Sequence, residues 1–337
     1  MQSGKLPPDI LNRLLARTTK DPGVIIGPAY GEDAAAVRFG GRILVAAGDP
    51  VTFATDRIGH YAVSVNANDI AVMGARPRYF LATILLPADA PESDAEAVFD
   101  QINDACRAIG VTLIGGHTEI TPSVADVVVS GCMLGEAAED SLITSAGARV
   151  GDAVILAGGI AVEGTTILAR EAADELAERG VTAEVISRAQ SYLDDPGICI
   201  AHYAKVATQT GGVTSMHDPT EGGLATGLRE LAAASGHGIE IVRDSIHILP
   251  ECAAICDALD LDPLGLIASG SLLITAPPDA AERIVRALGE DSAPVCIMGT
   301  VVNADAGMKF DDSTAIPEFD RDEIARHFAR ATNQEES

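Results

Sequence analysis

The sequence predicts a protein of two domains, each built from alternating strands and helices. Its 337 residues exceed the size at which one hydrophobic core usually stops growing. Short apolar runs of strand type alternate with longer segments of helical spacing. The same alternation begins again after a turn near residue 150. We therefore expect an N-terminal domain at residues 1–150 and a C-terminal domain at residues 151–337.

The first half opens with a short amphipathic helix. Its elements are expected at Ile10–Ala16 (helix), Ile43–Ala47 (strand), Ala62–Met73 (helix), Ser93–Ala108 (helix) and Val127–Leu134 (strand). In the third helix the apolar spacing predicts that four side chains face inward: Val98, Phe99, Ile102 and Ala105.

The second half starts with a strand that ends at two glycines. Its elements are expected at Ala153–Ala157 (strand), Glu163–Arg179 (helix), Ala183–Tyr192 (helix), Gly222–Ala234 (helix), Ile239–Val242 (strand), Ser271–Thr275 (strand) and Asp322–Ala329 (helix).

Composition excludes several classes of protein. The net charge of -26 argues against general nucleic-acid binding, which needs clustered Lys and Arg. No apolar run approaches the roughly 20 residues of a membrane-spanning helix, and the start of the chain lacks the pattern of a secretory signal. The six cysteines are scattered, as in reduced proteins of the cytosol. We expect a cytoplasmic protein that binds neither nucleic acid nor membranes.

Two aspartates follow features that suit a binding site. A glycine-punctuated loop, Gly27–Gly31, delivers Asp33 just before small residues that let another group approach. Asp49 ends an apolar strand, where a metal ligand would be held on a rigid element. Both features also occur in ordinary turns, and Asp before Pro often opens one.

A third segment places polar groups inside a helix of small and apolar residues. Asn66, Asn68 and Asp69 lie within it, and burying such groups without partners costs roughly 1–3 kcal/mol each. This cost favours a functional role. Oxygen ligands of this kind suit magnesium bound to a triphosphate.

A fourth segment runs from an apolar strand into Gly115 and Gly116. Paired glycines let backbone N–H groups approach a phosphate, and the following His117, Thr118 and Glu119 can touch a metal or a substrate. A structural histidine is the alternative.

A fifth segment places Asp218 and Thr220 before a predicted helix. The N-terminus of that helix would attract anions. The alternative is that one of the two side chains is an ordinary helix cap.

These five segments, in this order, resemble the superfamily of AIR synthase, selenophosphate synthetase, thiamine-monophosphate kinase and the hydrogenase maturation factor HypE. The resemblance extends from Gly4 to about Gly299. The motifs that carry it are Gly31–Ala35, Val65–Asp69, Gly74–Pro77, Gly115–Thr118 and His217–Leu224. The last of these, together with Asp262–Leu264 and Ser269–Gly270, is most similar to HypE-related proteins.

The resemblance implies a PurM-like fold of two α+β domains, in which the N-terminal domains of a homodimer form a β-barrel with ATP bound near the interface. It implies that magnesium and the phosphates are held by Asp33, Asp49 and Asp69. It assigns nucleotide contacts to Gly31, Asn68, Thr118, Thr220 and a turn formed by Gly115 and Gly116. It assigns catalytic roles to His117, Glu119 and Asp218.

The activity implied is transfer of the ATP γ-phosphoryl group to an oxygen of a small or carbamoyl-type substrate, with ATP and Mg²⁺ as cofactors and a maturation protein as a further partner. Two alternatives stay open: a small-molecule kinase, and a nucleotide-binding scaffold without catalysis. The chain departs from HypE in ending Ala331–Ser337 without a cysteine, and in carrying His117 where HypE has an acid. Selenophosphate synthetase has a histidine at that position, but the cysteine and lysine of its N-terminal loop have no counterpart around Tyr30–Asp33.

Overall fold

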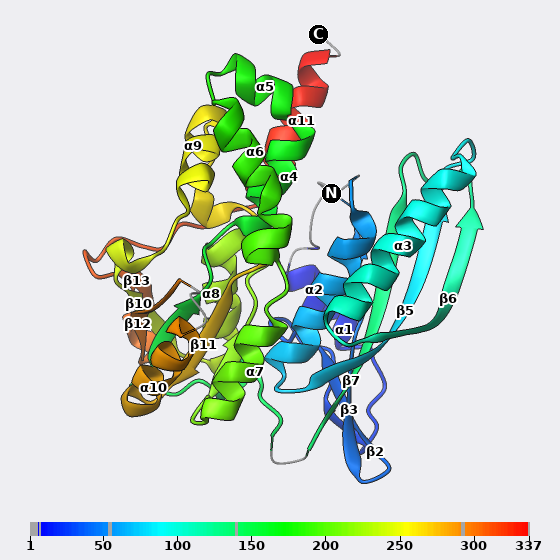
Figure 1. Ribbon diagram of the computed structural model, residues 1–337. Coiled ribbons are helices and arrows are strands. Elements are labelled where there is room, and N and C mark those ends of the chain that lie inside the picture. Colours follow the sequence, from blue (N-terminus) through cyan, green and yellow to red (C-terminus); the bar gives the residue numbers. More distant parts are fainter. Residues whose placement is uncertain (1–5, 7, 53–55, 139–140, 291–293, 336–337) are drawn as a thin grey trace. The chain divides into compact units, whose positions relative to one another are not determined.

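The computed structural model describes residues 6, 8–52, 56–138, 141–290 and 294–335 (Figure 1). The chain forms two compact units, each of mixed helices and strands. The N-terminal unit comprises Thr19–Pro28 and Asp33–Leu142. The C-terminal unit comprises Ile143–Ser337 together with two earlier segments, Met1–Thr18 and Ala29–Glu32. The N-terminal unit thus ends eight residues before residue 150, and the first helix, α1 (Pro8–Leu15), groups with the C-terminal unit.

The described part of the N-terminal unit consists of one sheet and two helices. The strands are β1 (Val24–Ile26), β2 (Ala35–Phe39), β3 (Arg42–Ala47), β4 (Pro50–Val51), β5 (Arg76–Leu86), β6 (Thr112–Ile120) and β7 (Val128–Ala137). Their order is β1-β2-β3-β7-β5-β6, and β4 also pairs with β7. Only β5 and β6 run parallel within this described sheet, and α3 (Glu92–Ala108) provides the crossover that a parallel pair requires.

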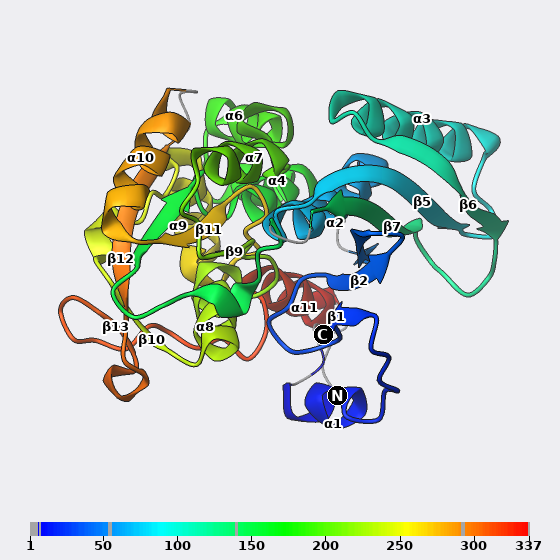
Figure 2. The same cartoon turned by 90° about the horizontal axis from the view of Figure 1, so that it is seen from below.

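Helices cover one face of this sheet. Figure 2 shows α3 and α2 (Ile58–Val72) on the same side of β5, β6 and β7. Gly131 and Gly135 of β7 leave space there, since a Cβ atom would lie 2.4 Å from Asn66 Nδ2 at Gly131 and 2.2 Å from Ile70 Cγ2 at Gly135. Successive residues of a strand point to opposite faces.

The other face of this sheet, which we call the open face, carries no helix from the described part of the N-terminal unit. Cross-strand pairs place half-buried apolar side chains on it: Val37, Leu44, Leu81, Leu85, Cys132 and Leu134. Strand β6 at the edge is exposed along nearly its whole length.

The C-terminal unit has its own sheet. The strands are β8 (Ala153–Ala157), β9 (Ser215–His217), β10 (Gly238–Ile241), β11 (Leu272–Ala276), β12 (Val295–Val302) and β13 (Met308–Phe310), in the order β13-β10-β12-β8-β11-β9. The helices besides α1 are α4 (Val162–Glu171), α5 (Ala173–Glu178), α6 (Ala183–Ser191), α7 (Ala201–Thr210), α8 (Gly223–Ser235), α9 (Pro250–Leu259), α10 (Pro278–Gly289) and α11 (Glu323–Glu335).

Helices pack on both faces of this second sheet. Leu224, Leu228 and Leu231 of α8 join a buried core with Val154 and Leu156 of β8. The α10 helix contacts β8, β11 and β12, and α7 packs beside α10. Because β8 is buried on both faces, all five of its residues are apolar.

Most predicted elements are confirmed, including β8 at its predicted bounds. Two details are wrong. Phe99 is 49 % exposed, because it lies beside the buried stripe of Val98, Ile102 and Ala105 rather than on it. The single helix predicted at Glu163–Arg179 is two helices, since Ala172 leaves helical geometry with φ -117° and ψ 25°. That break falls in a run of good helix formers without Gly or Pro, so no local pattern indicates it.

Candidate functional site

Two of the predicted metal ligands lie at one end of a strand pair. Strands β2 and β3 are antiparallel, with Ala35 opposite Ala46. Asp33 precedes Ala35 by two residues, and Asp49 follows Ala46 by three. Antiparallel register therefore brings Asp33 and Asp49 to the same end of the β2–β3 pair.

The backbone of Asp49 is held by neighbours from two elements. The side-chain carbonyl of Asn66 accepts a hydrogen bond from Asp49 N at 2.9 Å, and its amide donates to Asp49 O at 3.1 Å. Gly131 N also donates to Asp49 O at 2.9 Å. The residue itself is exposed, so its backbone is fixed while its carboxylate is accessible.

Asn68 and Asp69 come from α2, the helix that carries Asn66. Both are buried, with exposures of 0 % and 6 %. Asp69 lies one helical turn beyond Asn66, on the neighbouring part of the helix surface. Each of Asp33, Asp49, Asn68 and Asp69 can supply an oxygen ligand, and oxygen ligands fit magnesium.

Among the described residues, no three of His, Cys, Asp and Glu are gathered as a protein-only metal cage. This is compatible with a magnesium ion that takes one or two carboxylates and leaves its other positions to phosphate and water. The assignment of Asp33, Asp49 and Asp69 as ligands stays a prediction.

The two glycines of the fourth motif lie in a strand, not in a turn as predicted. Gly115 and Gly116 continue β6, where they pair with Leu81 and Ala82 of β5. A Cβ atom on Gly116 would lie 1.9 Å from Ala82 O. Close approach of two strands therefore requires glycine at this position, whatever else the backbone contacts.

His117 and Glu119 point away from the helices. They pair with Thr83 and Leu85, so they share the open face of the sheet, whereas Thr118 pairs with the buried Ile84 and faces the other side. His117 Nε2 lies 3.3 Å from Glu119 Oε2, and both side chains are exposed.

The sheet keeps His117 apart from Asp49. One row of partners crosses it from Pro50 to Ser130, then Thr83, then His117. Three strand spacings amount to roughly 14 Å. Within one N-terminal unit, therefore, His117 and Asp49 are not ligands of the same ion.

Asp218 and Thr220 belong to the C-terminal unit and precede α8. Neither is the helix cap considered above, because the N-cap position is Gly222, with φ 83°. The N–H of Gly222 donates instead to Asp322 Oδ2 at 2.6 Å. Asp218 is 2 % exposed.

His217 and Gly31, which lie near the loop before α8, both contact Glu230 of that helix. His217 Nε2 lies 3.1 Å from Glu230 Oε2, and both side chains are buried. Gly31 packs against the same helix: its φ is 85°, and a Cβ atom there would lie 3.0 Å from Glu230 O. The glycine thus has a structural reason, and its predicted contact with a nucleotide stays a prediction.

The sequence pattern does not indicate that two acids of the C-terminal unit, Glu163 and Asp322, are buried. Burial raises the pKa of Glu163 to about 7, the neighbouring Ser269 hydroxyl opposes this rise, and the charges of Asp322 and Glu221 add to it. Burial also raises the pKa of Asp322 to about 7, against the hydrogen bonds that it accepts from backbone N–H groups. Glu163 lies in the first turn of α4, and Asp322 directly precedes α11. Because exposed carboxylates are common at helix N-termini, the sequence position of these acids gives no sign that they are buried.

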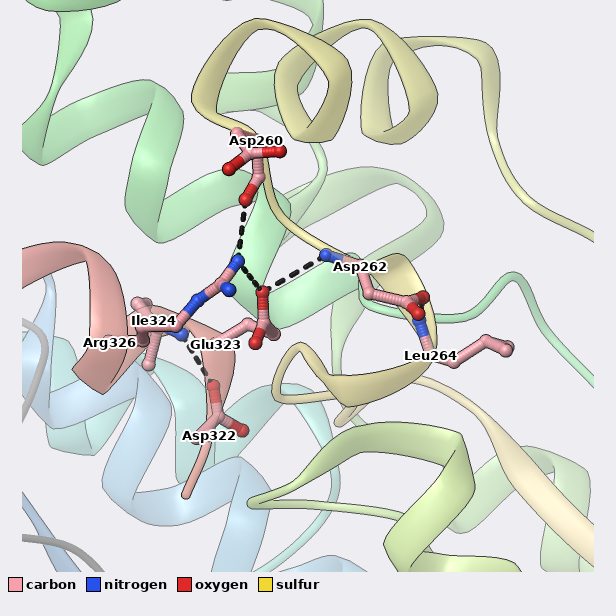
Figure 3. Close-up of polar contacts among 7 residues, drawn as sticks. All are labelled: Asp260, Asp262, Leu264, Asp322, Glu323, Ile324 and Arg326. Carbon is pink, nitrogen blue, oxygen red and sulfur yellow. Dashed lines mark hydrogen bonds and ion pairs between the residues drawn. The ribbon is translucent and has the colours of Figure 1, made fainter. Parts of the chain in front are cut away.

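Figure 3 shows Asp322 beside the residues that connect α11 to the end of α9. Ile324 N donates to Asp322 Oδ1 at 2.8 Å, and Glu323 Oε2 accepts from Asp262 N at 3.1 Å. Arg326 donates to Glu323 and to the Asp260 carbonyl. The same region borders a hollow of about 480 Å³, and none of the predicted site residues lines it.

The comparisons with known proteins agree with this two-unit fold. Residues 31–137 match the N-terminal domain of AIR synthase related protein, and residues 149–310 match its C-terminal domain. A relative in Methanocaldococcus jannaschii is 31% identical over 290 residues, covering 84% of this chain and 82% of the relative. Carbamoyl dehydratase HypE of Azotobacter vinelandii is 32% identical over 261 residues, covering 75% and 72%.

Solved structures with this fold have lower identity. HypE in complex with ATP gives a TM-score of 0.71 at 23% identity, covering 94% of this chain and 91% of that one. The HypE–HypF complex gives 0.69 at 22%, covering 87% and 94%. Thiamine monophosphate kinase from Aquifex aeolicus gives 0.68 at 19%, covering 92% and 97%.

Family models match most of the chain, and the relatives align over most of their own length. The chain belongs to the AIR synthase related protein family, with both the N-terminal and the C-terminal domain of that family.

Proposed function

We propose that this protein is an ATP-dependent enzyme of the HypE-like type, which transfers the ATP γ-phosphoryl group to an oxygen of a small or carbamoyl-type substrate. Relatives at 30–32% identity carry the name carbamoyl dehydratase HypE, and HypE itself has been solved with ATP. Phosphorylation turns a poor oxygen leaving group into a good one, which is the step that dehydration of a carbamoyl group needs. Such transfer depends mainly on positioning and on charge neutralisation.

The observation that carries this proposal is the arrangement of acids in the N-terminal unit. Asp33 and Asp49 lie at one end of the β2–β3 pair, and Asn66 ties Asp49 to the helix that bears Asn68 and Asp69. We propose that magnesium and the phosphates are held by Asp33, Asp49 and Asp69, each ion taking one or two of these carboxylates, with Asn68 assisting. Magnesium, when bound there, neutralises phosphate charge. A chain with a net charge of -26 needs such local compensation to hold a triphosphate.

Three further side chains are proposed to act on the substrate. His117 and Glu119 stand 3.3 Å apart on an exposed strand, a geometry in which they can share a proton. Asp218 is buried directly before α8. Gly31, Gly115, Gly116, Thr118 and Thr220 are proposed to contact the nucleotide through their backbone or hydroxyl groups.

A homodimer is proposed on the basis of the open face. Half-buried Leu81, Leu85 and Leu134 on one sheet face, next to an exposed edge strand, leave apolar area that a second sheet would cover. A second copy of the same sheet is the occupant we propose, forming a β-barrel across the dimer. A role in hydrogenase maturation, with a further protein partner, is proposed from the HypE–HypF complex.

No helix in the described part of the chain combines the length and the apolar character that crossing a bilayer demands.

The test is calorimetric titration of ATP with magnesium into the wild type and into Asp69→Ala, followed by assay of phosphate release with carbamoyl and carboxamide substrates. Tight binding that Asp69→Ala weakens at least tenfold, with substrate-dependent phosphate release, is expected. A stable phosphorylated product in place of free phosphate would instead identify a small-molecule kinase. Binding without turnover would identify a scaffold, and no binding to the wild type would remove all three.

A further inference from the structure

Asn66 is a buried amide whose polar atoms point at the backbone. It is 0 % exposed and lies in the middle of α2. Its carbonyl oxygen accepts from Asp49 N at 2.9 Å, while its nitrogen donates to Asp49 O at 3.1 Å and to Ala62 O at 2.8 Å. The Asn66 side chain thus hydrogen-bonds both the backbone N–H and the backbone carbonyl of Asp49, which lies 17 positions earlier in the chain.

The surroundings of this amide are built for it. A Cβ atom on Gly131 would lie 2.4 Å from Asn66 Nδ2, so a larger residue in β7 would displace the amide. The N–H of Gly131 adds a further hydrogen bond to Asp49 O at 2.9 Å. The Asp49 backbone is therefore held by both α2 and β7, at the point where β3 ends.

Fixing the backbone leaves the Asp49 carboxylate with only its side-chain torsions to order. A ligand that is already in place when an ion arrives loses less conformational entropy on binding. Residues that orient metal ligands in this way typically contribute a factor of 10–100 in metal affinity. Asn66 differs in this from its motif neighbours Asn68 and Asp69, which are assigned to the nucleotide and the ion themselves.

We propose that Asn66 is a positioning residue, whose side-chain amide holds the backbone of Asp49 so that the Asp49 carboxylate is pre-organised for the cation of a magnesium–nucleotide complex. This inference rests on the proposed function, since it takes Asp49 as a ligand of that cation. It assigns Asn66 no contact with the nucleotide.

The experiment measures binding of AMPPCP, a non-hydrolysable ATP analogue, with and without Mg²⁺ by calorimetry, and thermal unfolding of the metal-free protein. Asn66→Ala is expected to weaken the Mg²⁺-dependent part of binding about tenfold or more, with a smaller change in metal-free binding. Asn66→Asp keeps the acceptor for Asp49 N but places a carboxylate oxygen, which cannot donate, against Asp49 O and Ala62 O, so it is expected to lose as much as Asn66→Ala.

Gln101→Ala is the matched control. Gln101 is also an amide that bonds a backbone group in this unit, with its Oε1 accepting from Gly59 N at 3.0 Å at the start of α2. Its removal is expected to lower thermal stability and to leave the Mg²⁺ dependence unchanged.

A double-mutant cycle isolates the route of the effect. In an Asp49→Ala background, Asn66→Ala is expected to cause no further loss of Mg²⁺ dependence. Equal loss in that background, equal loss in Gln101→Ala, or failure of both Asn66 variants to fold where Gln101→Ala folds would each overturn the positioning role. Absence of Mg²⁺–AMPPCP binding in the wild type would instead show that the proposed function has failed, and this inference with it.

Discussion

Asp322 Oδ2 accepts a hydrogen bond from the backbone N–H of Gly222 at 2.6 Å. The two residues are 100 positions apart, so this bond ties the segment before α11 to the start of α8. Asp322 also accepts from Ile324 N at 2.8 Å, and it is 1 % exposed. A carboxylate thus occupies the helix N-terminus, where unpaired N–H groups favour negative charge.

Asp322→Ala is expected to destabilise the C-terminal unit. The substitution leaves the N–H groups of Gly222 and Ile324 without this acceptor, and each buried unpaired donor costs roughly 1–3 kcal/mol. The free energy of unfolding, measured with urea, should fall by a few kcal/mol. Asp320→Ala, at an exposed position two residues earlier, should change it by about 0.5 kcal/mol or less. Similar losses in both variants would contradict a capping role for Asp322.

Glu163→Gln is expected to flatten the dependence of stability on pH. The pKa of Glu163 rises from 4.5 to about 7 on folding, so between these values the native state binds more protons than the unfolded state. Stability from this group is therefore full below pH 4.5 and is lost as the pH rises to 7, by on the order of 3 kcal/mol. Asp322 has the same sign over a window from 3.8 to about 7.

The measurement is urea unfolding from pH 5 to pH 8. Above pH 7, Glu163→Gln should be more stable than the wild type, because it no longer buries a charge next to Asp322 and Glu221. Glu184→Gln, an exposed change of the same chemistry, should leave the wild-type curve unchanged. A wild-type curve that rises between pH 5 and pH 7 would show the assignment to be wrong.

Gly116→Ala is expected to destabilise the N-terminal unit more than Gly115→Ala. Both residues have similar backbone angles, with φ of 149° and 152°, so backbone strain is common to both variants. Only at Gly116 does the added Cβ atom meet Ala82 O, at 1.9 Å, whereas nothing lies within 4 Å of it at Gly115. Overpacking should add about 1–3 kcal/mol of destabilisation, measured by urea unfolding. Equal effects would mean that β6 is free to move away from β5.

Leu81→Glu is expected to dissociate the proposed homodimer. Leu81 lies on the open face opposite Cys132, and a charge there would have to be desolvated on association. Light scattering after gel filtration should give the mass of a monomer for this variant and of a dimer for the wild type. Phe99→Glu, at a residue that is 49 % exposed on α3, which covers the other face of the sheet, should stay dimeric. A dimeric Leu81→Glu would rule out this face as the interface.

Sequence pattern predicted the elements wherever one period dominated. β8 is apolar throughout and α3 has a clear amphipathic stripe, and both were found at or near their bounds. The pattern failed where tertiary contacts overrode it. Gly115 and Gly116 were expected to turn the chain, as glycines often do, but pairing with β5 keeps them extended in β6.

The candidate site was predicted as residue types rather than as an arrangement. The motif of Asn66, Asn68 and Asp69 stood out because a helix interior gives polar groups no partners. The sequence did not predict that Asn66 hydrogen-bonds the backbone of Asp49, because this contact depends on how α2 packs against β7. Likewise, the separation of His117 from the strand end at Asp49 follows from strand order, which no local pattern encodes: three strand spacings, roughly 14 Å, lie between His117 and Pro50.

The sequence by itself determined the family and the two-part organisation, because these depend on composition, on local periodicity and on short motifs in a given order. Only the tertiary structure decided that Asp33 and Asp49 lie at the same end of the β2–β3 pair, that Asp322 accepts from the N–H of Gly222 at the start of α8, and that Glu163 is buried. The physical reason is that burial and hydrogen-bond partners are set by contacts between residues far apart in the chain. The 100 positions between Gly222 and Asp322 leave no trace in the sequence near either residue.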